Sequence, residues 1–317
     1  MKTTNKIFRT ALALTCSLAA TLKAQDIYVS NTQGYTIGEY GMDGSTVNAS
    51  LISGLHDPNG LAISGNDVFI ANYNTGTIGE YTTSGATVNA TLIQGLGINS
   101  VSDVAVSGND LFVVTDTGTI GEYTTSGSTV NASLITGPVD ADNIAISGNN
   151  LFAISEYVPG YVGVVGAYTT SGATLNATLL TGLYYPYGIA ISGNDLFIST
   201  DGGIAEYTTS GSTINASLIS GLDGPCDIAI SGNDLFVVNN GNGTVGEYTI
   251  SGSTVNASLI TGLTNPVGIA ISPVPEPSTL ALAGLGGLSW LLFRLRPQIF
   301  AVKHPVHPPK KPVRNCQ

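Results

Sequence analysis

A unit of about forty residues recurs along most of this chain, and an internal repeat of that length limits the fold more than any other feature. Most units hold a short apolar strand, a Gly-Asn corner, a second apolar strand, and a third strand that ends in tyrosine. The first strand reads GLAIS (60–64), DVAVS (103–107), NIAIS (143–147), GIAIS (188–192), DIAIS (227–231) and GIAIS (268–272). The tyrosines are Tyr40, Tyr81, Tyr123, Tyr168, Tyr207 and Tyr248, spaced 39 to 45 residues apart.

A fourth strand, VNASLISGL or a close variant of it, follows a Ser-Gly or similar turn. Four short strands in a repeat of about 40 residues are typical of a β-propeller blade. The Gly-Asn corner favours a tight hairpin, because both residues tolerate a positive φ. Strands such as IAIS and LFVV are apolar on both faces, as expected of a sheet packed between two neighbours. The sequence therefore predicts an all-β, six-bladed β-propeller of four-stranded blades over residues 25–272.

Both ends of this region carry an incomplete unit. The region begins with a second strand, DIYVSN (26–31), and ends with a first strand, GIAIS (268–272). Pairing the C-terminal strand with the N-terminal strands would complete the sixth blade and remove open sheet edges that could pair with other chains. We therefore expect both ends of the chain to close the ring.

The units also resemble NHL-type propeller repeats. They share an aromatic-aliphatic second strand, an aliphatic-to-aromatic third strand, and a proline shortly before the first strand. The proline is present as Pro58, Pro186, Pro225 and Pro266, and it is missing before the strands at 103 and 143. This resemblance supports the fold and implies little about activity, because many unrelated functions occur on propellers.

Charge is distributed unevenly along the chain. All ten Lys and Arg residues lie between positions 2 and 23 or between 294 and 314, whereas the 21 acidic residues lie between Asp26 and Glu276. Residues 25–272 therefore contain no Lys or Arg. Such a surface repels phosphate backbones, which excludes nucleic acid as a partner.

Residues 1–24 read as a secretory signal peptide. Lys2, Lys6 and Arg9 form its basic region, residues 11–22 its apolar region, and Ala24 the expected cleavage position. The alternative is a membrane anchor, but an apolar run of this length is too short to span a bilayer. We expect an exported protein.

Residues 273–296 carry a second targeting pattern. Pro275, Glu276, Pro277 and Ser278 precede an apolar run that ends at Phe293 and is followed by Arg294 and Arg296. The segment resembles the PEP-CTERM sorting signal of exported bacterial proteins. We expect a short transmembrane helix with the arginines on the cytoplasmic side. An ordinary C-terminal anchor is the alternative.

The resemblance implies that an exosortase in the inner membrane recognises and cleaves the segment. The protein would be anchored transiently in that membrane and then reach the cell surface or extracellular matrix of a Gram-negative-type bacterium. Proteins with this signal are associated with exopolysaccharide and biofilm matrix. Residues 297–317, with five prolines, are expected to form a disordered tail that extends beyond the usual end of such a signal.

Two sets of polar residues are expected near the central channel. Asp103, Asn143 and Asp227 begin inner strands, and Asp116, Glu156 and Asp201 follow second strands. Lactonases that resemble gluconolactonase hold a divalent cation at this place, and Ca²⁺ takes several oxygen ligands. The alternative is turn chemistry, since Asn and Asp favour such corners.

Most third strands carry the tripeptide Gly-Glu-Tyr, which reads Ala-Glu-Tyr at 205–207, and no Lys or Arg in the body can pair with these glutamates. We expect these carboxylates to bond to hydroxyls, stay solvated, bind a cation, or titrate at a raised pKa. The glutamates are Glu39, Glu80, Glu122, Glu206 and Glu247, and Ala167 replaces the sixth.

Two classes of function remain open. The first is a non-catalytic surface or matrix propeller that binds a polysaccharide, a cation or a matrix protein. The second is a metal-dependent, lactonase-like hydrolase with a cation at the channel mouth. His56 is the only histidine of the body and no Gly-x-Ser-x-Gly motif occurs, which excludes a serine hydrolase. The near-identity of the units favours the first class, because an active site requires blades that differ in role.

Overall fold

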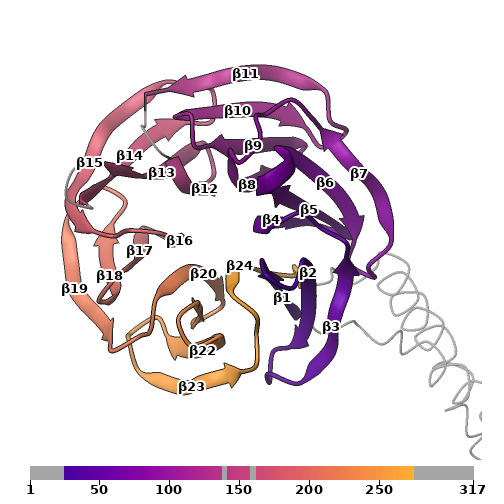
Figure 1. Ribbon diagram of the computed structural model, residues 1–317. Coiled ribbons are helices and arrows are strands. Elements are labelled where there is room, and N and C mark those ends of the chain that lie inside the picture. Colours follow the sequence, from indigo (N-terminus) through magenta and orange to yellow (C-terminus); the bar gives the residue numbers. More distant parts are fainter. Residues whose placement is uncertain (1–24, 138–140, 158–161, 275–317) are drawn as a thin grey trace, which may run out of the picture. The chain divides into compact units, whose positions relative to one another are not determined.

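The computed structural model describes residues 25–137, 141–157 and 162–274. The described residues form six four-stranded antiparallel sheets arranged around a central channel (Figure 1). Residues 24–274 make one compact unit. The predicted six-bladed propeller is confirmed. The signal peptide, most of the sorting segment with its expected helix, and the expected tail lie outside the described residues.

The strands follow the repeat, and each blade runs from an inner strand at the channel to an outer strand at the perimeter. Blade 1 contains β24 (Pro266–Ile271), β1 (Asp26–Asn31), β2 (Thr36–Gly41) and β3 (Thr46–Ser53). Blade 2 contains β4 (Pro58–Ser64), β5 (Asp67–Asn72), β6 (Thr77–Thr82) and β7 (Thr87–Ile93), with a short 3₁₀ turn, η1 (Tyr73–Thr75), after β5. Blade 3 contains β8 (Val101–Ser107), β9 (Asp110–Thr115), β10 (Thr119–Thr124) and β11 (Thr129–Thr136). Blade 4 contains β12 (Ala141–Ser147), β13 (Asn150–Tyr157), β14 (Val162–Thr169) and β15 (Thr174–Tyr184). Blade 5 contains β16 (Ile189–Ser192), β17 (Asp195–Thr200), β18 (Gly203–Thr208) and β19 (Thr213–Ser220). Blade 6 contains β20 (Pro225–Ser231), β21 (Asp234–Asn239), β22 (Thr244–Thr249) and β23 (Thr254–Ile260).

The two ends of the propeller meet in blade 1. β24 pairs antiparallel with β1, with Ile271 opposite Ile27. The Asp26 N–H donates to Ser272 Oγ at 2.8 Å, and the Ser272 N–H donates to the Asp26 carbonyl at 2.9 Å. The predicted closure of the ring by both chain ends is therefore confirmed.

The hydrophobic core lies between neighbouring blades. The aromatic residue of each second strand is fully buried or nearly so: Tyr28, Phe69, Phe112, Phe152, Phe197 and Phe236. Phe69 of blade 2 packs in one cluster with Leu111 and Val113 of blade 3. Each strand face thus contacts a neighbouring sheet, which explains why the repeats are apolar on both faces.

The glycine of the Gly-Glu-Tyr tripeptide is required for steric reasons. In blade 2 a Cβ on Gly79 would lie 2.7 Å from the ring of Tyr81, which folds back over the glycine two residues earlier. Glycine at this position therefore lets the tyrosine ring stay buried. Blade 5 has Ala205 instead, and there Tyr207 is only half-buried whereas Tyr81 is buried.

The glutamates of the same tripeptide differ between blades. In blade 1, Glu39 is buried and accepts a hydrogen bond from the Tyr28 hydroxyl at 3.0 Å. The other four third-strand glutamates lie opposite a phenylalanine. Burial, and next the charge of an aspartate on the neighbouring strand, raises the pKa of Glu80, Glu122, Glu206 and Glu247. Hydroxyl bonding and upward titration, two of the expected alternatives, thus both occur.

No helix among the described residues has both the length and the apolar character needed to cross a membrane.

Candidate functional site: the channel mouth

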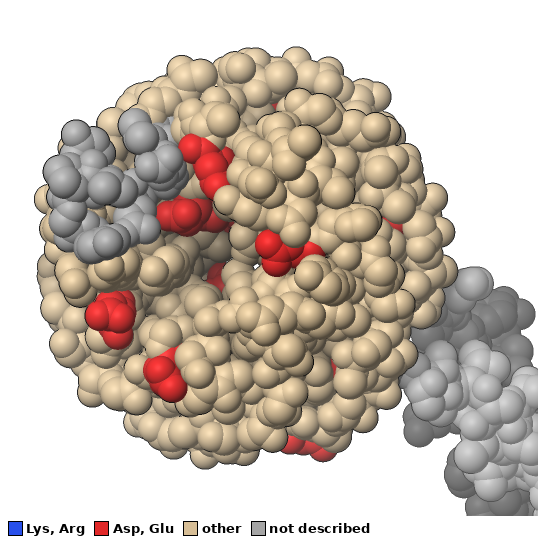
Figure 2. Space-filling view, viewed as in Figure 1, with Lys and Arg blue, Asp and Glu red and all other residues tan. Residues whose placement is uncertain are grey.

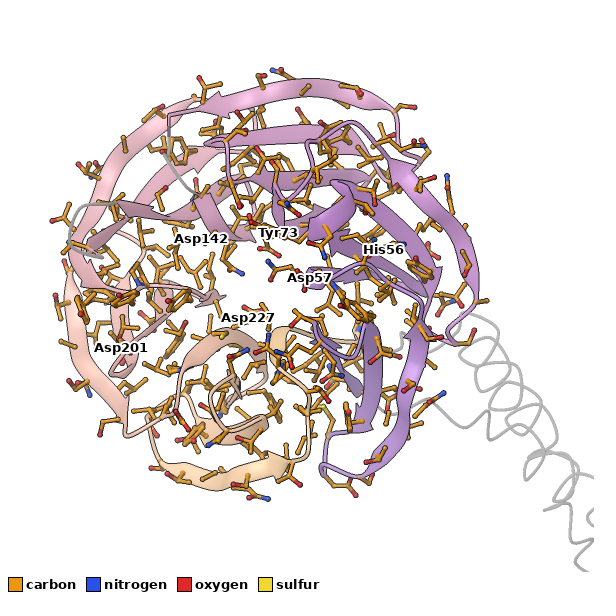
Figure 3. The ribbon with its side chains drawn as sticks, in the orientation of Figure 1. His56, Asp57, Tyr73, Asp142, Asp201 and Asp227 are labelled. Carbon is orange, nitrogen blue, oxygen red and sulfur yellow. The ribbon has the colours of Figure 1, made fainter. Side chains whose placement is uncertain are left out.

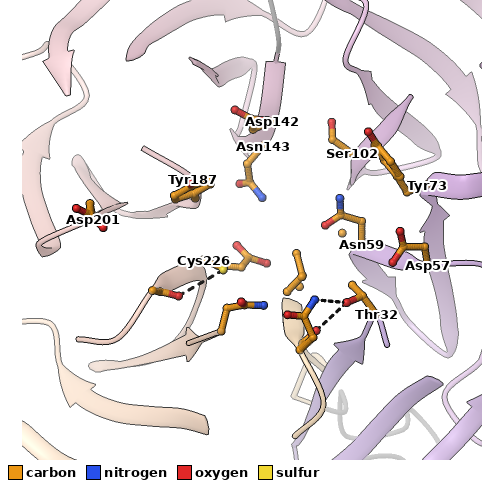
Figure 4. A pocket seen from close by; sticks show the side chains of 17 residues that line it. Thr32, Asp57, Asn59, Tyr73, Ser102, Asp142, Asn143, Tyr187, Asp201 and Cys226 are labelled. Atoms are coloured by element: carbon orange, nitrogen blue, oxygen red, sulfur yellow. Dashed lines mark hydrogen bonds between the residues drawn. The ribbon is translucent and has the colours of Figure 1, made fainter. Parts of the chain in front are cut away.

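A cavity of about 520 Å³ opens at one end of the central channel. Residues from all six blades line it (Figure 4). A pocket of this size, with several polar groups directed into it, is typical of ligand sites in proteins.

The repeat explains why these residues meet. Loops that join second to third strands and loops that join one blade to the next emerge at the same end of the propeller. Tyr73 lies in η1 after β5, and Asp201 lies between β17 and β18. Asp57 precedes β4 and Tyr187 precedes β16, so both come from loops that connect blades.

The mouth is acidic. Asp57, Asp142, Asp201 and Asp227 line the cavity, and red acidic residues lie beside the central opening in Figure 2. Residues 25–274 contain no Lys or Arg. The opening therefore carries a negative potential that attracts cations and repels anions.

Tyr73 lies among acidic groups from three blades. Its pKa is raised, first by burial and then by the charge of Asp116, to which its hydroxyl is also hydrogen-bonded. The charges of Asp57 and Asp142 raise it further. The Tyr73 hydroxyl therefore stays protonated and donates its hydrogen bond to Asp116. Burial also raises the pKa of the Asp57 carboxyl.

One position at the start of each inner strand forms a ring around the channel, and Asp103, Asn143 and Asp227 are its three polar members. Asp103 Oδ2 accepts the Ile144 N–H at 3.0 Å, and Asp227 Oδ2 accepts the Ile269 N–H at 3.0 Å. Asn143 Oδ1 accepts the Ile189 N–H at 3.2 Å. Each of the three side chains therefore holds the inner strand of the next blade.

Glycine occupies the other three positions of the ring: Gly60, Gly188 and Gly268. A Cβ on Gly60 would lie 2.8 Å from the Cα of Asp103. A Cβ on Gly188 would lie 2.7 Å from the Cα of Asp227. Neighbouring blades approach too closely at these positions to leave room for a side chain. Packing therefore requires glycine there.

Both carboxyl groups of the ring have a raised pKa. Burial raises the pKa of Asp227 to about 6, although the Ile269 and Ile228 N–H groups and the Asn143 side chain oppose the shift. Burial raises the pKa of Asp103 well above its ordinary value, and the charge of Asp227 raises it further. A second cavity of about 180 Å³, lined by these residues and by inner-strand aliphatic side chains, continues the channel.

The structure places the predicted ligands in two groups. Asp103, Asn143 and Asp227 come together in the ring, with Asn143 and Asp227 also lining the mouth. Asp201 lines the mouth, and Asp116 lies beside Tyr73.

The remaining predicted ligand, Glu156, belongs to β13, and its side chain lies outside the described part of the chain. Among the described residues, no three His, Cys, Asp or Glu side chains converge as a metal ion requires. The predicted Ca²⁺ site stays a prediction.

The sequence reasoning missed the aromatic residues of the mouth. Tyr187 lines the cavity and stacks on Tyr185, with ring centroids 6.2 Å apart, and Tyr185 meets Tyr184 edge-on at 4.8 Å. Tyr185 has a φ of +46°, which is uncommon for a residue other than glycine. The run Tyr-Tyr-Pro-Tyr at 184–187, which interrupts the repeat, was the available signal.

The C-terminal segment has a recognised counterpart. Residues 273–296 match the PEP-CTERM protein-sorting motif. The motif marks an exported protein that is anchored transiently in the membrane, processed by an exosortase and sorted to the cell surface. The predicted sorting signal is therefore confirmed.

Solved structures share the fold of the body. A chain of a nidogen/laminin complex is 16% identical, with a TM-score of 0.69 over 80% of this chain and 100% of that one. A functionally unknown protein from Desulfotomaculum acetoxidans is 16% identical, with a TM-score of 0.57 over 79% and 99%. A gluconolactonase from Xanthomonas campestris is 14% identical, with a TM-score of 0.56 over 68% and 80%.

These similarities show the fold alone. No curated protein sequence matches the chain significantly. The body of the chain is thus a six-bladed β-propeller, and residues 273–296 after it match the PEP-CTERM sorting motif.

Proposed function

We propose that this protein is a non-catalytic binding module of the cell surface or extracellular matrix, and that its channel mouth binds an extracellular polysaccharide. The observation that carries the proposal is the cavity of about 520 Å³, which combines carboxylates, amides and tyrosine rings. Tyrosine rings stack against sugar faces, while carboxylates and amides accept and donate hydrogen bonds to sugar hydroxyls.

The chemistry of the mouth supports binding more than catalysis. Cys226 is the thiol at the cavity, and burial raises its pKa to about 12, with the charge of Asp227 adding to the shift. The thiol is therefore protonated at neutral pH and is a poor nucleophile. The ring carboxyls accept main-chain N–H groups of the next blade, which gives Asp103 and Asp227 a structural role.

A polysaccharide-binding screen tests the proposal. Residues 25–274 contain all strands of the closed ring, so this fragment can be compared with a Tyr73→Ala, Tyr187→Ala double variant. Binding to at least one extracellular polysaccharide, weakened about tenfold or more in the double variant, is expected from the loss of two ring contacts. A Val88→Ala control on the exposed outer strand β7 should bind normally. Absence of any glycan binding would contradict the proposal.

The lactonase-like alternative makes a different prediction for the same fragment. It requires a divalent cation at the mouth and hydrolysis of a lactone that stops when the cation is chelated. Calorimetric titration with Ca²⁺ and a lactone-hydrolysis assay with and without EDTA distinguish the two functions. Metal-dependent hydrolysis would replace the binding proposal.

A further inference from the structure

We propose that the channel mouth is selective for a polycationic glycan, a polymer or oligomer of amino sugars whose amines are free. This inference rests on the proposed glycan-binding function and names the substrate class. The geometry that supports it is an acidic, aromatic cavity whose negative charges are spread around its opening.

The carboxylates lie on different sides of the mouth. Asp57, Asp142 and Asp201 are placed around the opening in Figure 4, and they come from three different blades. Asp227 lies nearer the centre, as Figure 3 shows. A ligand with several separated positive charges can reach carboxylates arranged in this way. A single metal ion requires ligands that converge, and the described residues hold no such group of three.

The surrounding charge excludes the opposite class of glycan. No Lys or Arg lies between residues 25 and 274 to bind a uronate or a sulfate. The negative potential of the mouth repels the carboxylates or sulfates of an anionic glycan, whereas it attracts protonated amino groups. Neutral glycans would use the hydrogen-bonding groups but gain nothing from the charge.

The aromatic residues favour a cation as well. Tyr73 and Tyr187 lie on opposite sides of the cavity in Figure 4, and their rings can face both a sugar ring and an ammonium group. Tyr187 is held by its stack on Tyr185, whose φ of +46° is a strained conformation. Strain of this kind is found more often at functional sites than elsewhere.

The test compares two oligosaccharides that differ only in the amine. A β-1,4-linked glucosamine tetramer and its fully N-acetylated form are titrated calorimetrically into residues 25–274 near pH 6.5. The free amine form is expected to bind about tenfold more tightly or better, because several carboxylate–ammonium contacts add together. Raising NaCl from about 50 to about 500 mM should weaken that binding and remove most of the difference.

A matched pair of variants locates the site. Asp57→Asn, Asp142→Asn and Asp201→Asn together remove three charges from the mouth and should lower the affinity for the free amine form about tenfold. Asparagine tolerates the positive φ of Asp57, which is +59°. The control triple variant carries Asp67→Asn, Asp110→Asn and Asp195→Asn, at corners between first and second strands at the other end of the propeller. The control should bind normally.

The outcomes separate the inference from the proposed function. Equal or tighter binding of the acetylated tetramer would overturn the inference while leaving glycan binding intact. Binding of the free amine form that resists salt, or that the control variant weakens as much as the mouth variant does, would also overturn it. The salt series needs only the unmodified sequence, so the inference can fail even if a variant does not fold. Binding of no glycan would remove both proposals.

Discussion

Replacing Asp227 with asparagine should make the propeller more stable at neutral and alkaline pH. The carboxylate lies in the channel ring, where it accepts the Ile269 N–H at 3.0 Å and the Ile228 N–H at 2.8 Å. Asn143 occupies the corresponding position of blade 4 and holds the next blade through an amide oxygen. Asparagine at position 227 can therefore keep the contact between blades without the charge.

The magnitude follows from the pKa of Asp227, which is about 6 in the folded protein against an ordinary value of 3.8. A difference of about 2 units corresponds to roughly 3 kcal/mol against the ionised form above pH 6. The Asp227 side chain is only partly buried and lines the cavity, so solvent screening makes this figure an upper limit. Loss of one accepted N–H bond offsets about 1 kcal/mol of the gain.

The direction of the pH dependence is fixed by the same shift. The folded protein holds this proton more tightly than the unfolded chain, so unfolding releases it between about pH 4 and pH 6. The free energy of unfolding of the wild type should therefore fall as pH rises through this window. The variant lacks this contribution, and its removed charge also lowers the pKa of the neighbouring Asp103.

Urea unfolding at about pH 3.5, 5, 6.5 and 8 measures the effect. The variant should exceed the wild type by about 1 to 2 kcal/mol at the two higher values and lose that advantage at the lowest. Asp43 serves as the control because it is exposed and its pKa is shifted in the opposite direction. Hydrogen bonds from the Ser45 hydroxyl and N–H lower that pKa. Asp43→Asn should give no gain at high pH. A difference between Asp227→Asn and wild type that is the same at every pH would show that ionisation of Asp227 does not destabilise the folded protein.

Three further predictions concern the repeat and its closure. Gly79→Ala should cost about 1–3 kcal/mol in urea unfolding, because the added methyl displaces the Tyr81 ring; an unchanged midpoint would contradict it. Tyr28→Phe should cost about 2 kcal/mol in the same assay by removing the hydrogen bond to Glu39; a neutral effect would show that this bond contributes nothing. A fragment of residues 25–264 lacks β24 and should lose cooperative unfolding by circular dichroism, whereas 25–274 should retain it.

The repeat allowed the fold to be predicted in detail. The sequence pattern changes little between units, so strand number, blade number and the shared blade 1 could all be read from it. The need for glycine at position 79 could not be predicted from the sequence. The Tyr81 ring folds back over Gly79, and this contact depends on the direction of the tyrosine side chain. The closure of the ring by β24 could be predicted because this first strand is not followed by the other three strands of a unit.

The site was predicted only in part. Asp103, Asn143 and Asp227 do lie at the channel, but their binding to main-chain N–H groups of the next blade depends on the distance between blades. That distance is set by packing of the whole ring and leaves no signal in a single repeat. Tyr73 and Tyr187 lie where the units diverge, so a search for repeated residues passes over them.

A crystal structure of residues 25–274 bound to the glucosamine tetramer would show where the sugar binds and which groups hold its amines. We expect sugar density in the channel mouth between Tyr73 and Tyr187, with amino groups within hydrogen-bonding distance of at least two of the mouth carboxylates. Sugar bound on the outer strands, with the mouth filled by solvent alone, would contradict it.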